Sequence, residues 1–225
     1  MRDMLAGVAD RLSLHMPGAQ GRGPFGPLDP YRLETTELAA TDDLYAPGGA
    51  IARAEVLAAR CAGAAHTLML TGGSTAGVQA MLLYAAGGGA VILPRNAHLS
   101  ALHLCAVAGL DVVFARPSFT ASGLCHTTDE SYLEALECRP DARALLVVRP
   151  DYYGALHWPA RAAARARALG IPVLCDEAHG AHLNWDAETP TAGALGADVW
   201  VQSAHKTLPA LNGGAWLHAG PGMDA

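Results

Sequence analysis

Short apolar runs alternate with helix-like segments from residue 51 onward. Seven runs are apolar throughout, at 67–70, 90–93, 112–115, 144–148, 172–175, 199–201 and 215–217. Between most of them, the spacing of apolar residues predicts helices over 51–62, 76–86, 98–108, 129–138 and 159–169. Fully apolar strands that alternate with helices are typical of a mostly parallel sheet covered on both faces. The pattern therefore predicts an α/β fold, a three-layer sandwich with a mostly parallel seven-stranded sheet.

The first 50 residues have a different composition. Proline and glycine are dense between residues 17 and 30, and Pro-Gly-Gly at 47–49 precedes the first helix of the repeating pattern. Frequent proline and glycine residues disfavour helices and strands. We expect a short N-terminal helix and an irregular arm over 1–50, followed by one major domain over 51–225.

Composition narrows the classes of function. The chain is 51% hydrophobic and 16% charged, and its net charge of −6 opposes binding to the phosphates of nucleic acids. Its five cysteines form no CxxC pair, so we expect neither a disulfide scaffold nor a metal site. Residues 1–13 do not resemble a signal peptide, and no stretch reaches the roughly 20 apolar residues of a membrane span. We expect a cytoplasmic protein that binds no membrane.

Polar residues that could bind a ligand or take part in catalysis follow the predicted strands. In parallel sheets, ligands bind beyond the carboxyl ends of the strands. The segments to consider are therefore 71–75, 94–100, 150–154, 176–182 and 202–207.

The segment 71–75 reads Thr-Gly-Gly-Ser-Thr and precedes a predicted helix. Its glycines allow a tight turn, and the free N–H groups of a helix N-terminus suit a phosphate. The alternative is an ordinary turn in which Ser74 or Thr75 caps the helix. No lysine follows the glycines, so the segment is not a P-loop.

The segment 176–179 reads Asp-Glu-Ala-His and also has alternatives. It matches the acidic box of a helicase family, but no phosphate-loop lysine precedes it. A metal site built on His179 and His182 lacks further ligands at supporting spacing. The interpretation that we favour makes Asp176 the partner of a protonated heterocycle, because a nearby carboxylate keeps such a ring nitrogen charged.

Lys206 is the only lysine among 15 basic residues. A lone lysine is most often a solvated surface residue. Here, arginine occupies every other basic position, and arginine does not serve as a Schiff-base nucleophile whereas a desolvated lysine does. A single lysine directly after a predicted strand therefore suggests covalent chemistry.

These segments together resemble a known family. The run 201–211, Val-Gln-Ser-Ala-His-Lys-Thr-Leu-Pro-Ala-Leu, closely resembles the pyridoxal 5′-phosphate (PLP) attachment signature of the Orn/Lys/Arg decarboxylases, which have the aspartate aminotransferase fold. The runs 176–182, 94–98 and 150–154 and the arm residues 36–38 and 42–44 match the family in the same order. The resemblance extends over nearly the whole chain.

The resemblance implies roles for individual residues. Lys206 is similar to the lysine that forms the internal aldimine with PLP, and Asp176 to the aspartate paired with the pyridine nitrogen. His98 is similar to the histidine stacked on the ring, although alone it reads as a histidine at a helix start. The remaining implied cofactor-binding residues are Ala178 and His179 near the ring and Ser74, Thr75, Ser203 and His205 at the phosphate. Tyr152 and Tyr153 are further candidates for lining the site, or are structural.

The implied activity is decarboxylation of lysine, arginine or ornithine, a reaction that supplies polyamine biosynthesis, in a homodimer or higher homo-oligomer. Alternatives are an aminotransferase or lyase reaction on the same fold, or an inactive PLP-binding homologue. The family's small C-terminal domain has no counterpart within these 225 residues. Where relatives have Pro-Thr-Tyr-Tyr, this chain has Asp151 in place of threonine, which leaves the substrate open.

Overall fold

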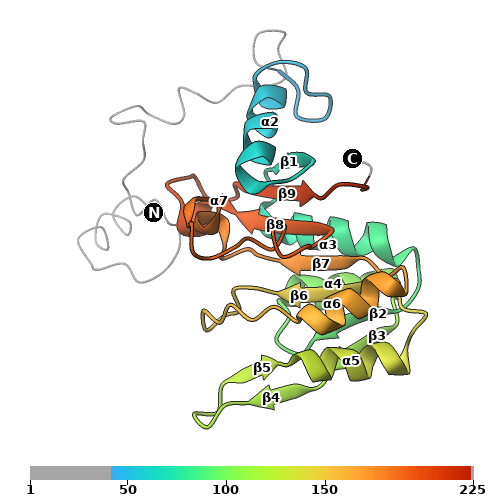
Figure 1. Cartoon of the computed structure of the whole chain (residues 1–225). Coiled ribbons are helices and arrows are strands. Elements are labelled where there is room, and N and C mark those ends of the chain that lie inside the picture. The colour runs from blue at the N-terminus through green and yellow to red at the C-terminus, as the bar shows by residue number, and fades with distance from the viewer. Residues whose placement is uncertain (1–41, 224–225) are drawn as a thin grey trace, which may run out of the picture.

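The computed structural model describes residues 42–223, and its centre is one seven-stranded sheet (Figure 1). The strand order is β1-β9-β8-β7-β6-β2-β3. The strands are β1 His66–Leu70, β2 Val91–Pro94, β3 Val112–Ala115, β6 Ala144–Val148, β7 Val173–Asp176, β8 Val199–Ser203 and β9 Ala215–Ala219. Strand β9 is antiparallel to both of its neighbours, and the other pairings are parallel.

Helices cover both faces of this sheet (Figure 1). They are α2 Ala50–Ala62, α3 Gly73–Ala86, α4 Leu99–Ala108, α5 Asp129–Cys138 and α6 Ala160–Ala168. Helices α3 and α4 share one buried apolar cluster with the sheet, whereas α5 and α6 share another. These two clusters are the interfaces of a three-layer sandwich, as the sequence predicts.

Alternation along each strand divides the side chains between the two clusters. In β7, Leu174 packs toward α3 and α4, whereas Val173 and Cys175 pack toward α5 and α6. All three are fully buried, which explains why the strand reads as apolar throughout. The same alternation determines which polar residues beyond the strand ends face each layer.

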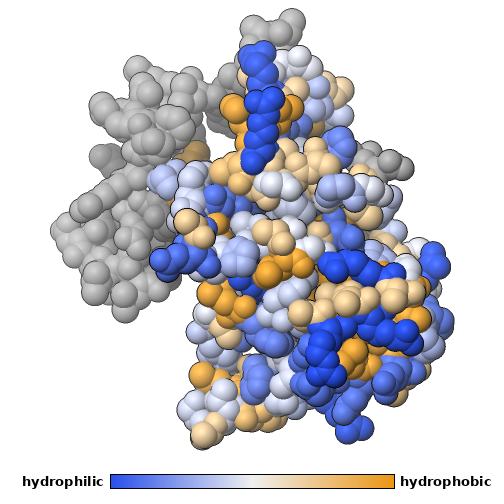
Figure 2. Space-filling model, in the orientation of Figure 1, coloured by the Kyte–Doolittle hydropathy of each residue, from blue (hydrophilic) through white to orange (hydrophobic). Residues whose placement is uncertain are grey.

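Helix α6 illustrates how an outer helix is divided between core and solvent. Ala162, Ala163 and Ala166 are buried, while the arginines at 161, 165 and 167 are exposed. The arginines therefore form a solvated face of this helix. Hydrophilic side chains predominate on the surface over α5 and α6, with apolar ones showing between them (Figure 2).

The seven strands and five helices that the sequence predicts are all present, with three differences. Helix α3 begins at Gly73, three residues earlier than expected, and its N-cap is Gly72 with no side-chain cap. The alternative in which Ser74 or Thr75 caps the helix is therefore wrong, because both residues lie inside the first turn. Gly73 has a φ of +68°, which glycine tolerates without strain.

The other two differences are short elements that the sequence pattern missed. One is a two-stranded antiparallel hairpin, β4 Pro117–Phe119 with β5 Cys125–Thr127. The other comprises the single-turn helices η2 Ala181–Trp185 and α7 Ala204–Thr207. None is long enough to show a hydrophobic period.

The expected N-terminal helix and most of the irregular arm lie outside the described residues. Among residues 42–223, no helix combines the length and the apolar character that crossing a membrane requires.

Candidate functional site

A cavity of about 260 Å³ lies beyond the carboxyl ends of β6 and β7. Every one of the five polar segments that follow the predicted strands contributes to its wall. Ser74 comes from α3, residues 96–100 from the loop before α4 and its first two residues, and Pro150 and Tyr152 from the loop after β6. Asp176 is the last residue of β7, Ala178 and His179 follow this strand, and Lys206 comes from α7. The cavity therefore lies where the topology of a parallel sheet predicts a ligand.

Strand alternation explains why Asp176 enters this cavity. Its neighbour two residues back, Leu174, packs toward α3 and α4, so the Asp176 side chain points to the same layer. Val148 reaches the cavity from β6 by the same rule. Ser203, two residues after Val201 of the α3 and α4 cluster, faces that layer from β8.

Asp176 is a buried carboxylate, with only 5% of its surface exposed. Its Oδ1 atom accepts a hydrogen bond from the backbone N–H of Ala178 at 3.1 Å. Burial raises the pKa of Asp176, while this hydrogen bond and the charges of Lys206 and His98 lower it. A cationic group next to the carboxylate would favour its charged form and so offset the cost of desolvation.

Lys206 lies half-buried on α7, opposite His179. Its Nζ atom is 3.2 Å from the Nε2 atom of His179. Burial lowers the pKa of Lys206, and the Asp176 charge opposes this effect. Burial, followed by the charges of Lys206, His98 and His205, lowers the pKa of His179 to about 4. At neutral pH, His179 is therefore an uncharged partner for the lysine amine.

His98 is the N-cap of α4 and also lines the cavity. Its Nδ1 atom accepts a hydrogen bond from the backbone N–H of Ser100 at 3.2 Å and lies 2.9 Å from the Ser100 hydroxyl. The interpretation as a histidine at a helix start is thus confirmed. The cap fixes the ring at the cavity wall, so the structural role does not exclude contact with a ligand.

Four residues with an implied phosphate role differ in their placement. Ser74 is buried in the first turn of α3 and lines the cavity, whereas the Thr75 side chain is exposed and does not. Ser203 is fully buried, and its hydroxyl has no hydrogen-bond partner among the described residues. His205 is also buried, and its Nδ1 atom lies 3.0 Å from the carbonyl oxygen of Gly214.

Of the two tyrosines, Tyr152 lines the cavity and is 86% exposed. Tyr153 lies outside the cavity wall, and its ring meets that of Tyr152 edge to face with centroids 5.7 Å apart. Asp151, at the position for which the family resemblance implies threonine, is buried and accepts hydrogen bonds from the N–H groups of Tyr153 and Ala155, both at 2.9 Å. Its carboxylate therefore shapes the loop that carries Tyr152.

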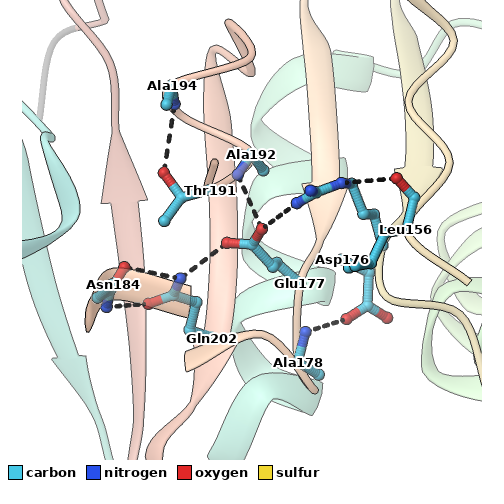
Figure 3. A network of polar contacts seen from close by, with 10 residues as sticks. Leu156, Asp176, Glu177, Ala178, Asn184, Thr191, Ala192, Ala194 and Gln202 are labelled. Atoms are coloured by element: carbon cyan, nitrogen blue, oxygen red, sulfur yellow. Dashed lines mark hydrogen bonds and ion pairs between the residues drawn. The ribbon is translucent and has the colours of Figure 1, made fainter. Parts of the chain in front are cut away.

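Sequence reasoning missed a buried ion pair behind the cavity (Figure 3). The Nη1 atom of Arg149 lies 3.1 Å from the Oε1 atom of Glu177, and both side chains are almost fully buried. Glu177 also accepts hydrogen bonds from the Gln202 amide at 2.7 Å and from the Ala192 N–H at 2.8 Å. Alternation would have placed Glu177 opposite to Asp176, but the partners of its carboxylate come from distant segments.

No group of three or more His, Cys, Asp and Glu side chains is arranged to hold a metal ion within the part of the chain that the structure describes.

Comparison with known proteins gives a consistent result. The family model for the Orn/Lys/Arg decarboxylase major domain matches residues 32–223. The uncharacterized protein YaaO of Bacillus subtilis (strain 168) is 38% identical over 218 residues, which cover 92% of this chain and 45% of that protein. An arginine decarboxylase of the same strain is 34% identical over 195 residues, covering 85% of this chain and 40% of the relative.

Solved structures share the fold. The constitutive lysine decarboxylase of E. coli superimposes with a TM-score of 0.67 at 21% identity, covering 99% of this chain and 36% of that one. L-threonine transaldolase from Pseudomonas fluorescens gives a TM-score of 0.62 at 19% identity, with 85% and 43% covered.

The 225 residues span about half the length of the curated relatives that they match. The family model nevertheless covers most of the sequence, including every segment that lines the cavity. The chain therefore belongs to the Orn/Lys/Arg decarboxylase family, of which it carries the major domain.

Proposed function

We propose that the cavity binds PLP covalently through Lys206, and that the protein decarboxylates a basic amino acid. The observation that carries this proposal is the placement of Lys206 and Asp176 in the wall of one cavity at the carboxyl edge of the sheet. Family membership supports it.

The residues at the cavity fit PLP chemically. Asp176 supplies a buried carboxylate whose raised pKa reflects a shortage of compensating positive charge, which a pyridinium nitrogen would provide. The hydroxyls of Ser203 and Thr207 are buried and have no hydrogen-bond partner among the described residues. Buried orphan hydroxyls are costly, and phosphate oxygens would satisfy them.

PLP, when bound, supplies an electron sink for the bond that breaks at Cα of the substrate. Our proposal gives this chain the remaining tasks. Lys206 would hold the cofactor through its amine, Asp176 would keep the ring nitrogen protonated, and His98 and Ala178 would contact the ring. His179 stays neutral beside Lys206, where it orients the amine. This division of roles rests on the residues at the cavity and on the family resemblance.

For the phosphate, we propose the first turn of α3 with Ser74, together with Ser203 and His205. The free N–H groups and the positive dipole end of this 14-residue helix favour an anion. Because the Thr75 side chain is exposed, its contribution is proposed to come from its backbone N–H alone.

The substrate class that we propose is lysine, arginine or ornithine, because relatives include an arginine decarboxylase and structural neighbours include a lysine decarboxylase. We further propose that 1–50 is an arm, that 51–225 is the cofactor domain, and that the protein acts in the cytoplasm as a homodimer. Tyr152 is largely exposed at the cavity, where a second subunit could cover it.

A titration with PLP tests the cofactor. After removal of unbound PLP, which itself absorbs in this range, the full chain should retain an absorbance band shifted from that of free PLP, and Lys206→Ala should not. A band that survives in Lys206→Ala, or that never forms in the unaltered chain, would contradict the proposal.

Product analysis tests the reaction. With lysine, arginine and ornithine as separate substrates, release of CO2 and the matching amine is expected from one of them. Formation of a keto acid instead would indicate a transaminase. PLP binding without turnover of any amino acid would indicate a binding homologue.

A further inference from the structure

A row of buried polar side chains lies on the face of the sheet opposite to the cavity. Glu177 follows Asp176 directly, so the two carboxylates point to opposite layers. Arg149 and Gln202 lie beside Glu177, one just beyond the end of β6 and the other within β8. Glu177 and Gln202 have no exposed surface, and Arg149 is 2% exposed. These three residues are called the polar row below.

The polar row ties together segments that form the wall of the cavity. Arg149 donates from Nε to the carbonyl oxygen of Leu156 at 3.1 Å, which closes the loop that carries Pro150 and Tyr152. Gln202 is followed by Ser203 and then by α7 with Lys206. The Glu177 carboxylate joins Arg149 to Gln202, and Glu177 belongs to the same segment as Asp176 and His179. Its hydrogen bond with the Gln202 amide is drawn in Figure 3.

The fit around Glu177 is tight. A Cβ atom at Gly180 would lie 2.4 Å from Cγ of Glu177 and 3.2 Å from Cδ of Pro150. The turn after β7 therefore packs directly on the Glu177 side chain. Asn184 of η2 extends the contacts, because its amide donates to the Gln202 carbonyl oxygen at 2.8 Å.

The polar row requires the desolvation of two charged groups, Arg149 and Glu177, which opposes folding. A buried ion pair commonly contributes no more stability than apolar side chains of similar volume. Burial raises the pKa of Glu177 to about 7, even though the Gln202 and Ala192 hydrogen bonds and Arg149 lower it. Directional contacts, unlike apolar packing, hold several loops in one defined arrangement.

We propose that Glu177 is a positioning residue. It acts through Arg149 and Gln202 to hold the three cavity-lining segments after β6, β7 and β8 in fixed positions relative to one another. It touches neither the cavity nor Lys206, so it acts on them through the backbone. The expected effect on PLP binding rests on the proposed function, whereas the expected effect on Lys206 also applies to the cofactor-free protein. There, the amine of Lys206 should be held in place by the polar row.

The test compares Glu177→Gln with Leu136→Ala in the full chain. Leu136 lies in α5, is 1% exposed and belongs to the α5 and α6 cluster, so its truncation destabilises the fold away from the cavity. Both variants are first characterised by urea denaturation. If the two variants lose a similar free energy of unfolding, any difference between them at Lys206 reflects positioning and not general destabilisation.

Two measurements are made on each protein. The first is the rate at which trinitrobenzenesulfonate modifies Lys206 in the cofactor-free protein, as a function of pH. Because Lys206 is the only lysine, peptide mass spectrometry separates it from the terminal amine. The second is the dissociation constant for PLP, measured by absorbance.

We expect Glu177→Gln to shift the pH profile of Lys206 modification and to weaken PLP binding by roughly tenfold, the size of effect that outer-shell partners have in metal sites. Leu136→Ala should leave both unchanged. Equal behaviour of the two variants would overturn the proposal. If the unaltered chain binds no PLP, the proposed function fails, while the modification profile still tests the positioning role.

A second variant covers the case in which Glu177→Gln does not fold. Gln202→Met removes the hydrogen bonds that Gln202 of β8 makes to Glu177, Asn184 and His218, and it leaves the ion pair in place. It should shift the Lys206 profile in the same direction by a smaller amount. An unchanged profile would overturn the proposal. So would failure of both variants to fold, because the polar row would then be required for the fold itself.

Discussion

The amine of Lys206 and the imidazole of His179 lie 3.2 Å apart, between Nζ and Nε2. The two residues come from different segments, and both line the cavity. Since burial and nearby positive charges lower the pKa of His179 to about 4, its ring is neutral at physiological pH and accepts a hydrogen bond from the ammonium group. Lys206 thus has a hydrogen-bond acceptor in a desolvated environment.

Replacement of His179 by Phe should lower the pKa of Lys206 further. The ammonium form loses a charge-assisted hydrogen bond, which contributes about 1.5–3 kcal/mol, equivalent to about one to two pKa units. The midpoint of the pH profile for Lys206 modification should shift down accordingly. His179→Gln restores an acceptor oxygen and serves as the control, with a midpoint near that of the unaltered chain. The same midpoint in both variants would contradict this prediction.

Asp176→Asn should weaken cofactor binding while stabilising the cofactor-free protein. Burial raises the pKa of Asp176, so in the cofactor-free protein folding disfavours the charged form of this carboxylate. Asparagine keeps the acceptor for the Ala178 N–H but carries no charge to pair with a pyridinium nitrogen.

Urea denaturation without PLP should show a higher free energy of unfolding for Asp176→Asn than for the unaltered chain. Addition of PLP should stabilise the variant much less, because stabilisation by a ligand follows its affinity. A variant that gains as much stability from PLP as the unaltered chain would refute a charge-pairing role for Asp176.

Much of the fold could be predicted because strands such as β7 are apolar on both faces and are bounded by polar segments. The position of the cavity followed from topology, since the carboxyl ends of β6 and β7 lie at one edge of the sheet. Lys206 stood out through composition alone.

Other features depend on contacts that no local pattern contains. The ion pair joins Arg149 to Glu177 across 28 positions, and Gln202 lies 25 positions beyond Glu177. The residues Pro117–Phe119 form a strand only because Cys125–Thr127 pairs with them. The alternative of a cap by Ser74 is wrong because α3 begins at Gly73, earlier than the apolar spacing indicates.

Gly77→Ala should move α3 away from the sheet. An added Cβ would lie 2.5 Å from Cγ2 of Val201 and 2.8 Å from Cδ1 of Leu70. Overpacking costs about 1–3 kcal/mol, and the higher helix propensity of alanine returns up to about 1 kcal/mol. We expect a lower urea midpoint, together with weaker PLP binding because Ser74 moves with the helix.

Gly48→Ala is the control for Gly77→Ala, since a Cβ there would meet open space. Its urea midpoint and PLP affinity should match those of the unaltered chain. A Gly77→Ala protein with unchanged PLP affinity would argue against the phosphate role proposed for the start of α3.

Two buried groups, Glu177 and His218, give opposite contributions to the pH dependence of stability. Glu177 has its pKa raised from 4.5 to about 7, so the folded state holds a proton more tightly and stability falls as pH rises through this window. His218 has its pKa lowered from 6.5 to about 3 by burial. The folded state therefore resists protonation of His218, and stability falls as pH drops from 6.5 toward 3.

His218→Gln should remove the acid-sensitive part of this dependence. His218 is fully buried between Thr67, whose hydroxyl lies 2.7 Å from Nδ1, and Gln202, whose Oε1 atom lies 3.2 Å from Nε2. Glutamine does not titrate, so on the order of 3 kcal/mol of the loss between about pH 7 and about pH 4 should disappear. Urea denaturation at both pH values measures it, and because Glu177 is retained in both proteins, its opposite contribution cancels in the comparison. An acid-induced loss of the same size in both proteins would show that His218 is not the group responsible.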